Sequence, residues 1–137
     1  MYDFDEIEEK KQTLSYKVIG CALEVYKVLG PGLLESAYQM ALKKELEDEG
    51  FIVETEVPLN LNYKGAVINC GYRMDLVVNR QLIIELKSVS EFQLIHFKQL
   101  RTYLRLSGIK MGLLLNFNVS NFKDGCRLVT LDKGYVS

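Results

Sequence analysis

One short segment near the C-terminal end constrains the fold of this 137-residue chain more than any other. Residues 111–117 read MGLLLNF and are almost continuously apolar. A run of this length suits a β-strand, and the lack of alternation between apolar and polar residues suits a strand that is buried on both faces. Such a strand has other strands beside it and other elements over both faces of its sheet.

The periodicity of the apolar residues elsewhere predicts those elements. Apolar positions recur at helical spacing in three segments, residues 6–29, 33–49 and 91–106. Alternation at a period of two predicts strands at residues 51–57, 59–63, 66–78 and 81–89, and a last strand is expected at residues 126–131. The order is α-α-β-β-β-β-α-β-β, which is typical of an α/β (α+β) protein with a mixed β-sheet flanked by helices.

The domain organisation follows from the breaks between these segments. The tripeptide Gly30-Pro31-Gly32 ends the first helix, because proline cannot continue a helix and glycine relieves the turn. No repeat or Gly/Ser linker divides the chain. We therefore expect one domain over residues 1–137, with an N-terminal helix within residues 1–30 and a core over residues 31–131.

The first helix is apolar over an unusually large part of its circumference. It carries two adjoining stripes, Tyr16, Ile19, Leu23 and Tyr26, and Leu14, Val18, Cys21, Val25 and Val28. A helix of this kind has to be covered on two sides. Either the rest of the domain covers the second stripe, or a second copy of the chain does so in a homodimer through the N-terminal helix.

Composition and hydropathy exclude several classes of protein. The chain is 48% hydrophobic and 26% charged, close to the average of globular proteins, which argues against disorder. The longest uncharged stretch, between Lys110 and Lys123, is too short to cross a bilayer. Residues 1–6 are acidic where a signal peptide would be basic, so we expect a cytoplasmic protein without a membrane partner. The cysteines at positions 21, 70 and 126 are predicted to be small buried residues in a reducing compartment.

The net charge of −1 hides an asymmetry between the two halves of the chain. Residues 1–72 carry 7 lysines and 13 acidic residues, whereas residues 73–137 carry 10 basic and 5 acidic residues. Such a split is found where one half meets an acidic partner, and it is equally ordinary for solvated faces of opposite sign. A pI near 5.9 excludes a protein that coats nucleic acid by bulk charge.

Three charged residues interrupt segments that are otherwise apolar. Asp75 lies within YRMDLVV, and Glu85 and Lys87 lie within LIIELK. An isolated charge in such a strand is costly to bury, so these side chains need partners. Glu85 and Lys87 are two residues apart and therefore share one face of a strand. A carboxylate pair with an adjacent ammonium group can hold a divalent cation and orient a water molecule beside it.

The length of the loop between the two strands decides whether Asp75 and Glu85 meet. A two-residue loop sets Asp75 opposite Ile84, on the wrong face. A three-residue loop pairs Val78 with Leu82 and sets Asp75 opposite Glu85, where two like charges repel unless a cation lies between them. We prefer the longer loop, which also places Met74, Leu76 and Val78 on the opposite, dry face. The alternative is that each carboxylate finds its own Lys or Arg partner.

These residues resemble a known signature. Asp75 followed by Glu85-Leu86-Lys87 after a hairpin is similar to the Asp…Glu-x-Lys pattern of the PD-(D/E)XK nuclease superfamily. The sequence Gly32-Leu33-Leu34-Glu35-Ser36-Ala37-Tyr38 resembles the motif that gives the GxxExxY protein family its name. Gln99 and Tyr103 are similar to the QxxxY element of the recombination-exonuclease branch of the superfamily. The resemblance spans residues 14–128.

The resemblance implies a restriction-endonuclease-like core and a metal-dependent nuclease that hydrolyses phosphodiester bonds of nucleic acid. We expect nucleic acid as the partner and rank DNA ahead of RNA. Glu35, Asp75, Glu85 and Lys87 would be its catalytic residues. Mg²⁺ or Mn²⁺ would be held by Asp75, Glu85 and the backbone carbonyl of Leu86, with Glu35 as a ligand directly or through water. Lys87 would orient the attacking water and stabilise charge on the phosphate.

Two helices supply expected supporting residues. Tyr38 is expected to pack in the core with its hydroxyl bonded to the acidic cluster, although Glu35 before it also suits a helix N-terminus without any site. Gln99 is expected to bond Lys87, the carboxylates or a phosphate, or to be an ordinary polar position, and Tyr103 accompanies it. His96 is expected at the edge of the site and not as a ligand. Lys98, Arg101 and Arg105 form a basic helix face that suits nucleic-acid phosphates or plain solvent.

A second class of function is kept beside the nuclease. The same fold could serve as a non-catalytic interaction module that forms a homodimer through the first helix. The chain has neither a GxxxxGK[ST] phosphate loop nor a GxGxxG motif after a strand, which argues against nucleotide-binding enzymes of those types. The complete set of acidic residues with its lysine favours the enzyme.

Overall fold

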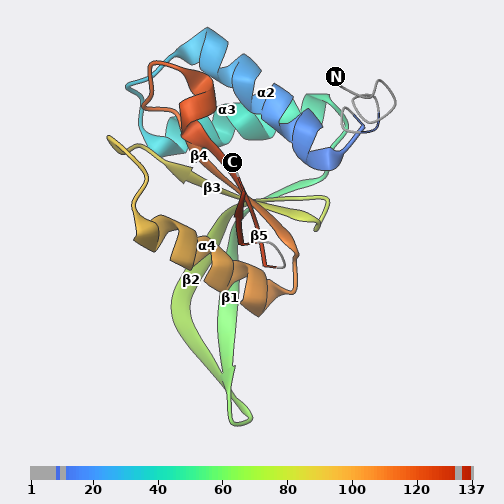
Figure 1. Ribbon diagram of the computed structural model, residues 1–137. Coiled ribbons are helices and arrows are strands. Elements are labelled where there is room, and N and C mark those ends of the chain that lie inside the picture. The colour runs from blue at the N-terminus through green and yellow to red at the C-terminus, as the bar shows by residue number, and fades with distance from the viewer. Residues whose placement is uncertain (1–8, 10–11, 132–133, 137) are drawn as a thin grey trace.

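A six-stranded mixed sheet forms the centre of the structure, a computed structural model that describes residues 9, 12–131 and 134–136 (Figure 1). The strands follow the chain order and are β1 (Val53–Tyr63), β2 (Ala66–Val78), β3 (Leu82–Lys87), β4 (Met111–Asn116), β5 (Cys126–Thr130) and β6 (Gly134–Val136). The helices are α2 (Leu14–Leu29), α3 (Glu35–Asp48) and α4 (Leu94–Ser107), and a 3-10 helix, η1, spans Phe122–Gly125. Only β3 and β4 are parallel within the described sheet, because α4 carries the chain from one to the other.

Helices cover both faces of the sheet, as predicted (Figure 1). Leu42 of α3 packs with Ile84 in a core under α2 and α3, whereas Leu104 of α4 packs with the neighbouring Ile83 in a core on the other face. Successive strand residues point to opposite faces, so both positions are apolar. Strand β4 is buried almost throughout, which confirms the prediction that residues 111–117 form a strand covered on both sides.

The expected helices are present with shorter bounds. Within the described residues α2 begins at Leu14, after Thr13 accepts a hydrogen bond from the Tyr16 amide as an N-cap. Residues 6–8 and 10–11 of the longer predicted helix lie outside the described residues. Helix α4 ends where it was expected, because Gly108 adopts the left-handed conformation with φ 77°.

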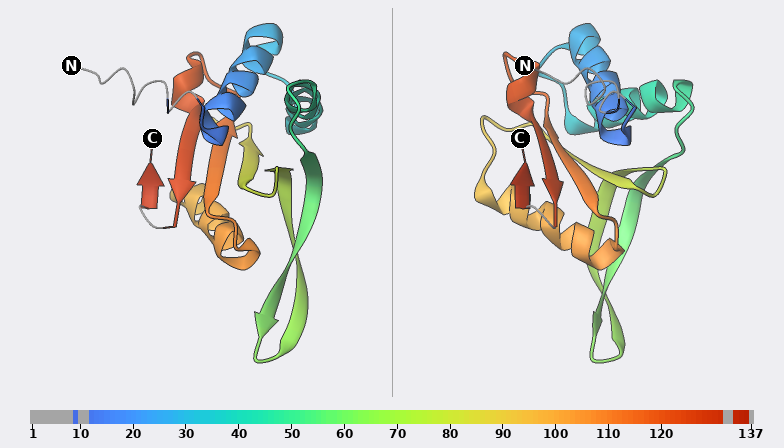
Figure 2. Two further views of the ribbon diagram at one scale, coloured as in Figure 1. Left: turned by 90° about the vertical axis from the view of Figure 1, so that its right-hand side faces the viewer. Right: turned by 45° about the vertical axis from the view of Figure 1, so that its right-hand side comes forward.

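The N-terminal half of the sheet differs from the prediction of two strands separated by Pro58. One strand, β1, runs through Pro58, which pairs with Arg73. Since β1 is the edge of the sheet, the missing amide of proline is tolerated there. The outer part of the β1–β2 hairpin projects beyond the rest of the molecule as a two-stranded arm (Figure 2). Strand β6 and helix η1 were not predicted.

The loop between β2 and β3 has the preferred length. Val78 pairs with Leu82 and Leu76 with Ile84, so three residues form the turn and Asp75 is aligned with Glu85. The prediction for Met74 was wrong, because it packs in the core under α4 and not with Leu76. On the facing strand Glu56 has φ 51°, and this left-handed residue disturbs the regular alternation at this point of the hairpin.

The chain itself covers part of the apolar stripe of α2 that contains Tyr26. The Tyr26 hydroxyl donates a hydrogen bond to the carbonyl of Val119, and its ring packs edge-on against Phe122. Tyr16 and Val28 remain exposed on this helix. The structure describes the isolated chain, so the homodimer stays a prediction.

Two further predictions concern cysteines and membranes. Cys21 is buried as predicted, but the expectation for Cys70 was wrong, because it lies on the projecting arm and is exposed. Cys126 is half-buried. Within the described part of the chain, no helix combines the length and the apolar character that crossing a membrane requires.

Candidate functional site

The predicted acidic residues lie on three elements. Asp75 lies in β2, Glu85 in β3, and Glu35 is the first residue of α3. Helix α3 packs over this part of the sheet, and Glu35 and Asp75 line one small cavity of about 230 Å³ together with Leu86. Glu35 and Asp75 therefore share a cavity, and Glu85 is not among the residues that line it.

The two strands exchange side-chain hydrogen bonds at this point instead of backbone pairs. The described ladder between β2 and β3 ends at Leu76 and Ile84. Beyond it, the Asp75 amide donates to Glu85 Oε2 at 2.8 Å, and the Leu86 amide donates to Asp75 Oδ2 at 2.8 Å. Each carboxylate thus satisfies a backbone donor of the opposite strand and lies between the strands.

Burial raises the pKa values of both carboxyl groups. Glu85 is only 3% exposed, and burial, followed by repulsion from Asp75, raises the pKa of the Glu85 carboxyl to about 8. Burial also raises the pKa of Asp75, against the opposing effects of its hydrogen bond from Leu86 and the positive charge of Lys87. Two acids that resist ionisation together, next to a lysine, are typical of functional sites.

The donor set fits a hard divalent cation. Among the described residues, the second oxygen of each carboxylate, Asp75 Oδ1 and Glu85 Oε1, has no hydrogen bond. The amide and carbonyl of one strand residue point to the same strand edge, so Leu86 directs its carbonyl toward Asp75 as well. Mg²⁺ is commonly held by one or two carboxylates and keeps several waters. No three His, Cys, Asp or Glu side chains in the described residues are gathered as a complete metal-binding group.

Tyr38 acts on the loop before α3 and not on the acidic cluster. It is fully buried and stacks on Phe117, with ring centroids 4.3 Å apart. Its hydroxyl donates to the carbonyl of Gly30 and accepts from the Leu33 amide at 3.1 Å. The expected bond to the acidic cluster was therefore wrong. Gly32 has φ 103° in this loop, which glycine adopts readily. The two hydrogen bonds of Tyr38 hold the loop just before Glu35, the first residue of α3.

Lys87 continues the site toward α4. It lies two residues beyond Glu85 on β3, and its ammonium donates to Gln99 Oε1 at 3.2 Å. Gln99 in turn donates to the Tyr103 hydroxyl at 3.1 Å. Burial and the nearby charge of Glu85 raise the pKa of Tyr103. Of the partners expected for Gln99, the structure has Lys87.

The other predicted residues of α4 lie around this chain of hydrogen bonds. His96 Nδ1 accepts from the Gln93 amide at 2.9 Å and so caps the helix, and burial and Lys87 lower its pKa. Lys98 is exposed and lines a cavity beside Gln99. Arg101 is directed toward β5, where it donates to the carbonyl of Thr130 at 3.4 Å. Arg105 is exposed.

Sequence reasoning missed three residues near the site. Gln39 donates to the Asp75 carbonyl at 2.8 Å and to Glu56 Oε1 at 3.1 Å, and both Gln39 and Glu56 line the small cavity. The spacing of four between Glu35 and Gln39 on one helix was an available signal. Asn116, aligned with Lys87, bonds both the amide and the carbonyl of Val89 and fixes the chain that leaves β3. Its position in an apolar run concealed this role.

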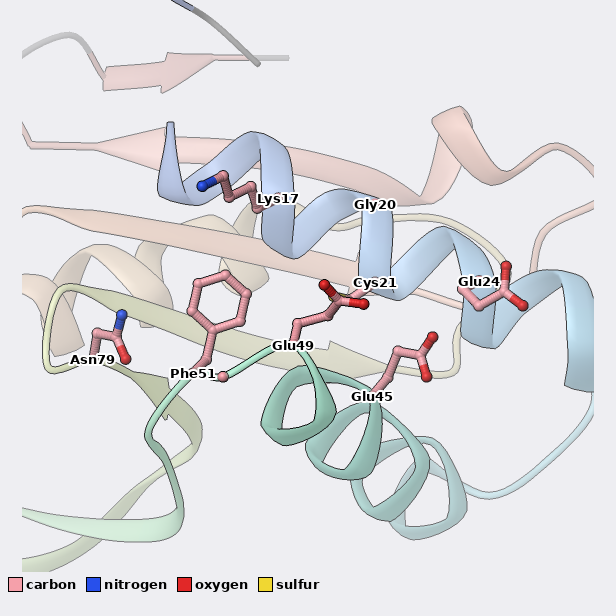
Figure 3. A pocket seen from close by; sticks show the side chains of 9 residues that line it. Lys17, Gly20, Cys21, Glu24, Glu45, Glu49, Phe51 and Asn79 are labelled. Atoms are coloured by element: carbon pink, nitrogen blue, oxygen red, sulfur yellow. The ribbon is translucent and has the colours of Figure 1, made fainter. Parts of the chain in front are cut away.

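A cavity of about 740 Å³ lies elsewhere, between α2 and α3 (Figure 3). Glu45 of α3 and Glu49, the residue after this helix, point into the space below α2, where Glu24 adds a third carboxylate and Lys17 a single ammonium (Figure 3). This charge repels phosphate groups. The cavity contains none of the predicted site residues and does not suit a nucleic acid.

The fold and the site together define a nuclease-like protein with an acidic pair and a lysine on one central hairpin. A family model described as the PD-(D/E)XK nuclease superfamily matches residues 12–129, and the chain belongs to this superfamily.

A solved structure has a similar fold. It is the crystal structure of SSO0001, which is 18% identical and has a TM-score of 0.52. The similarity covers 88% of this chain and 79% of that one. At this identity the match shows the restriction-endonuclease-like arrangement of the sheet and helices and nothing about activity. No curated protein matches the sequence significantly.

Proposed function

We propose that this protein is a metal-dependent nuclease that hydrolyses phosphodiester bonds of nucleic acid. The observation that supports it most is the pair Asp75 and Glu85, held between two strands with one oxygen of each carboxylate left over. A buried acidic pair without a function would be costly, because the two charges repel one another and are poorly solvated. Membership of the superfamily agrees with this proposal.

Each side chain has a distinct task in the proposed reaction. Mg²⁺ or Mn²⁺, when bound, supplies a Lewis acid for the phosphate and lowers the pKa of a water molecule. Asp75, Glu85 and the Leu86 carbonyl would hold the ion, and Glu35 would approach from α3, directly or through water. Lys87 would orient the attacking water and stabilise the negative charge that develops on the phosphate. Gln99 holds the lysine ammonium in position.

We propose nucleic acid, with DNA before RNA, as the substrate. Exposed basic residues of α4, Lys98 and Arg105, lie on the helix that carries Gln99 and suit contacts with phosphates. A narrower membership, in the GxxExxY family, is proposed on Gly32, Glu35 and Tyr38 alone. The free cysteines are consistent with a reducing compartment, which supports a cytoplasmic location.

A non-catalytic interaction module is the second candidate. Tyr16 and Val28 are exposed on α2, with Val28 71% exposed, which leaves apolar surface for a second copy. If the protein is such a module, divalent metal should not change its melting temperature.

Thermal unfolding with and without Mn²⁺ separates the two candidates. A site that binds metal only in the folded state raises the melting temperature as the metal concentration rises. The free energy of unfolding increases by about 2.7 kcal/mol when the metal concentration is a hundred times the dissociation constant. Asp75→Asn keeps an acceptor for the Leu86 amide but removes the charge, so it should abolish this rise. Asp48→Asn, which changes an exposed acid paired with Lys44, is the control. No rise in the wild type, or a rise in Asp75→Asn, contradicts the metal site.

A further inference from the structure

A second cavity adjoins the candidate site on the side of α4. It measures about 420 Å³, within the range of about 300–1,000 Å³ that small-molecule sites occupy. Tyr72 of β2 and Tyr103 and Ile95 of α4 form its apolar walls, and Lys98, His96 and Gln99 add polar groups. The cavity therefore combines aromatic surface with positive charge.

Gln99 connects the cavity with the proposed reaction centre. Gln99 lines it and also accepts the hydrogen bond from Lys87, so one side chain separates the cavity from the catalytic lysine. Tyr103, on its wall, is bonded to the same Gln99. A group bound in the cavity would lie next to a phosphate at Lys87.

Tyr72 is available for stacking. Its ring lies 5.7 Å from the ring of Tyr103, centroid to centroid, and the two planes are tilted by 59°. The side chain is 36% exposed, and its hydroxyl has no hydrogen bond among the described residues. Ile95, which also lines the cavity, is 65% exposed. Large apolar side chains that remain open beside a lysine suit a flat ligand that carries negative charge on an attached group.

We propose that this cavity binds an unpaired base of the substrate strand, adjacent to the phosphate that is cleaved. This inference rests on the proposed function and adds a substrate class to it: single-stranded nucleic acid, or a strand end whose terminal base is unpaired. Proteins that bind single strands combine a positive surface with aromatic rings on which bases stack. The bases of an intact duplex are stacked on each other and cannot enter a cavity walled by Tyr72 and Tyr103.

Binding of fluorescent oligonucleotides tests the proposal independently of cleavage. We would compare oligo(dT) with an abasic chain of the same length, which has the same phosphates and no bases, in Ca²⁺. Stacking of one base contributes on the order of tenfold in affinity. Wild type should therefore bind oligo(dT) about tenfold more tightly than the abasic chain, and Tyr72→Ala should lose this difference, whereas Tyr72→Phe should keep it.

Tyr63→Ala provides a matched control, because Tyr63 is an exposed tyrosine of the same hairpin outside the cavity. Its preference for oligo(dT) should equal that of the wild type. Equal binding of both chains by the wild type, or a preserved preference in Tyr72→Ala, overturns the proposal. Base-dependent binding without any cleavage in Mn²⁺ would support the cavity and contradict the nuclease. Cleavage of duplex and single strands at equal rates, unaffected by Tyr72→Ala, would support the nuclease and contradict the cavity.

Discussion

Asp75 and Glu85 have a structural task besides the proposed chemical one. Each carboxylate accepts a backbone amide of the opposite strand, so the pair connects β2 and β3 where the ladder ends. Replacing either residue with alanine leaves a buried donor without its partner, which costs about 1–3 kcal/mol. Amide substitutions, which keep an acceptor oxygen, are therefore the informative variants at these two positions.

The protonation of Glu85 makes the stability of the metal-free protein depend on pH. The pKa of the folded state is about 8, whereas the ordinary value of 4.5 applies to the unfolded chain. The folded state therefore holds one more proton between these values. Its contribution to stability is complete below pH 4.5 and is lost as the pH rises through about 8. The free energy of unfolding should fall by up to about 1.4 kcal/mol per pH unit in this range.

Urea denaturation without metal measures this dependence. Glu85→Gln cannot ionise but can still accept the Asp75 amide, so the variant should lose most of the slope and exceed the wild type in stability near pH 8. Asp75, whose pKa is also raised, accounts for a residual slope of the same sign. Glu24→Gln, at an exposed position on α2, should keep the wild-type slope. The same slope in wild type and Glu85→Gln would contradict the assignment.

At the scale of the elements, two glycines have opposite roles. A Cβ atom at Gly125, at the end of η1, would lie 2.0 Å from the backbone carbonyl oxygen of Asn116. Asn116 is aligned with Lys87, so this close approach lies beside the candidate site. A Cβ at Gly20, within α2, meets nothing within 4 Å. The first glycine is required by its surroundings, and the second only weakens its helix.

Alanine at each position should therefore change stability in opposite directions. Gly125→Ala forces the backbone apart and should lower the free energy of unfolding by about 1–3 kcal/mol. Gly20→Ala should raise it by about 0.5–1 kcal/mol, because alanine favours the helix over the unfolded chain. Chemical denaturation of the two variants beside the wild type measures both values. A stable Gly125→Ala protein would show that η1 does not approach β4 so closely.

Local sequence patterns predicted some features of the β-strands and missed others. The three-residue turn between Val78 and Leu82 was predicted correctly, since the apolar pattern of the two strands favours one turn length. Met74 was placed on the wrong face because alternation cannot reveal a left-handed residue such as Glu56 on the facing strand. Pro58 suggested a break, and only the position of β1 at the sheet edge explains why the strand continues.

Long-range contacts account for the rest of the site. The bond of Tyr38 to the loop at Gly30, and that of Gln39 to the Asp75 carbonyl, depend on how α3 approaches the sheet. Spacing along the sequence gives the helix face but not this approach. The exposure of Cys70 likewise follows from the projecting arm, because the alternation that predicts a strand at residues 66–78 does not show that its outer part lies beyond the rest of the sheet.

At the scale of the whole molecule, the arrangement joins three layers at one hairpin. Helix α3 brings Glu35 from one face of the sheet, and α4 brings Gln99 to Lys87 from the other. The central hairpin lies between them with its two carboxylates. The sheet therefore supports the proposed reaction centre, which needs residues of both helices.

Cleavage of a labelled oligonucleotide panel in Mn²⁺, by wild type and Lys87→Ala, tests the central claim most directly. Lys87 is half-buried at the end of β3, so the variant should fold normally. Removing a preorganised charged group should lower the rate by about 10²–10³. Lys110→Ala, at an exposed lysine before β4, should cleave like the wild type. Metal-dependent cleavage at the same rate by Lys87→Ala would show that the activity does not come from this site.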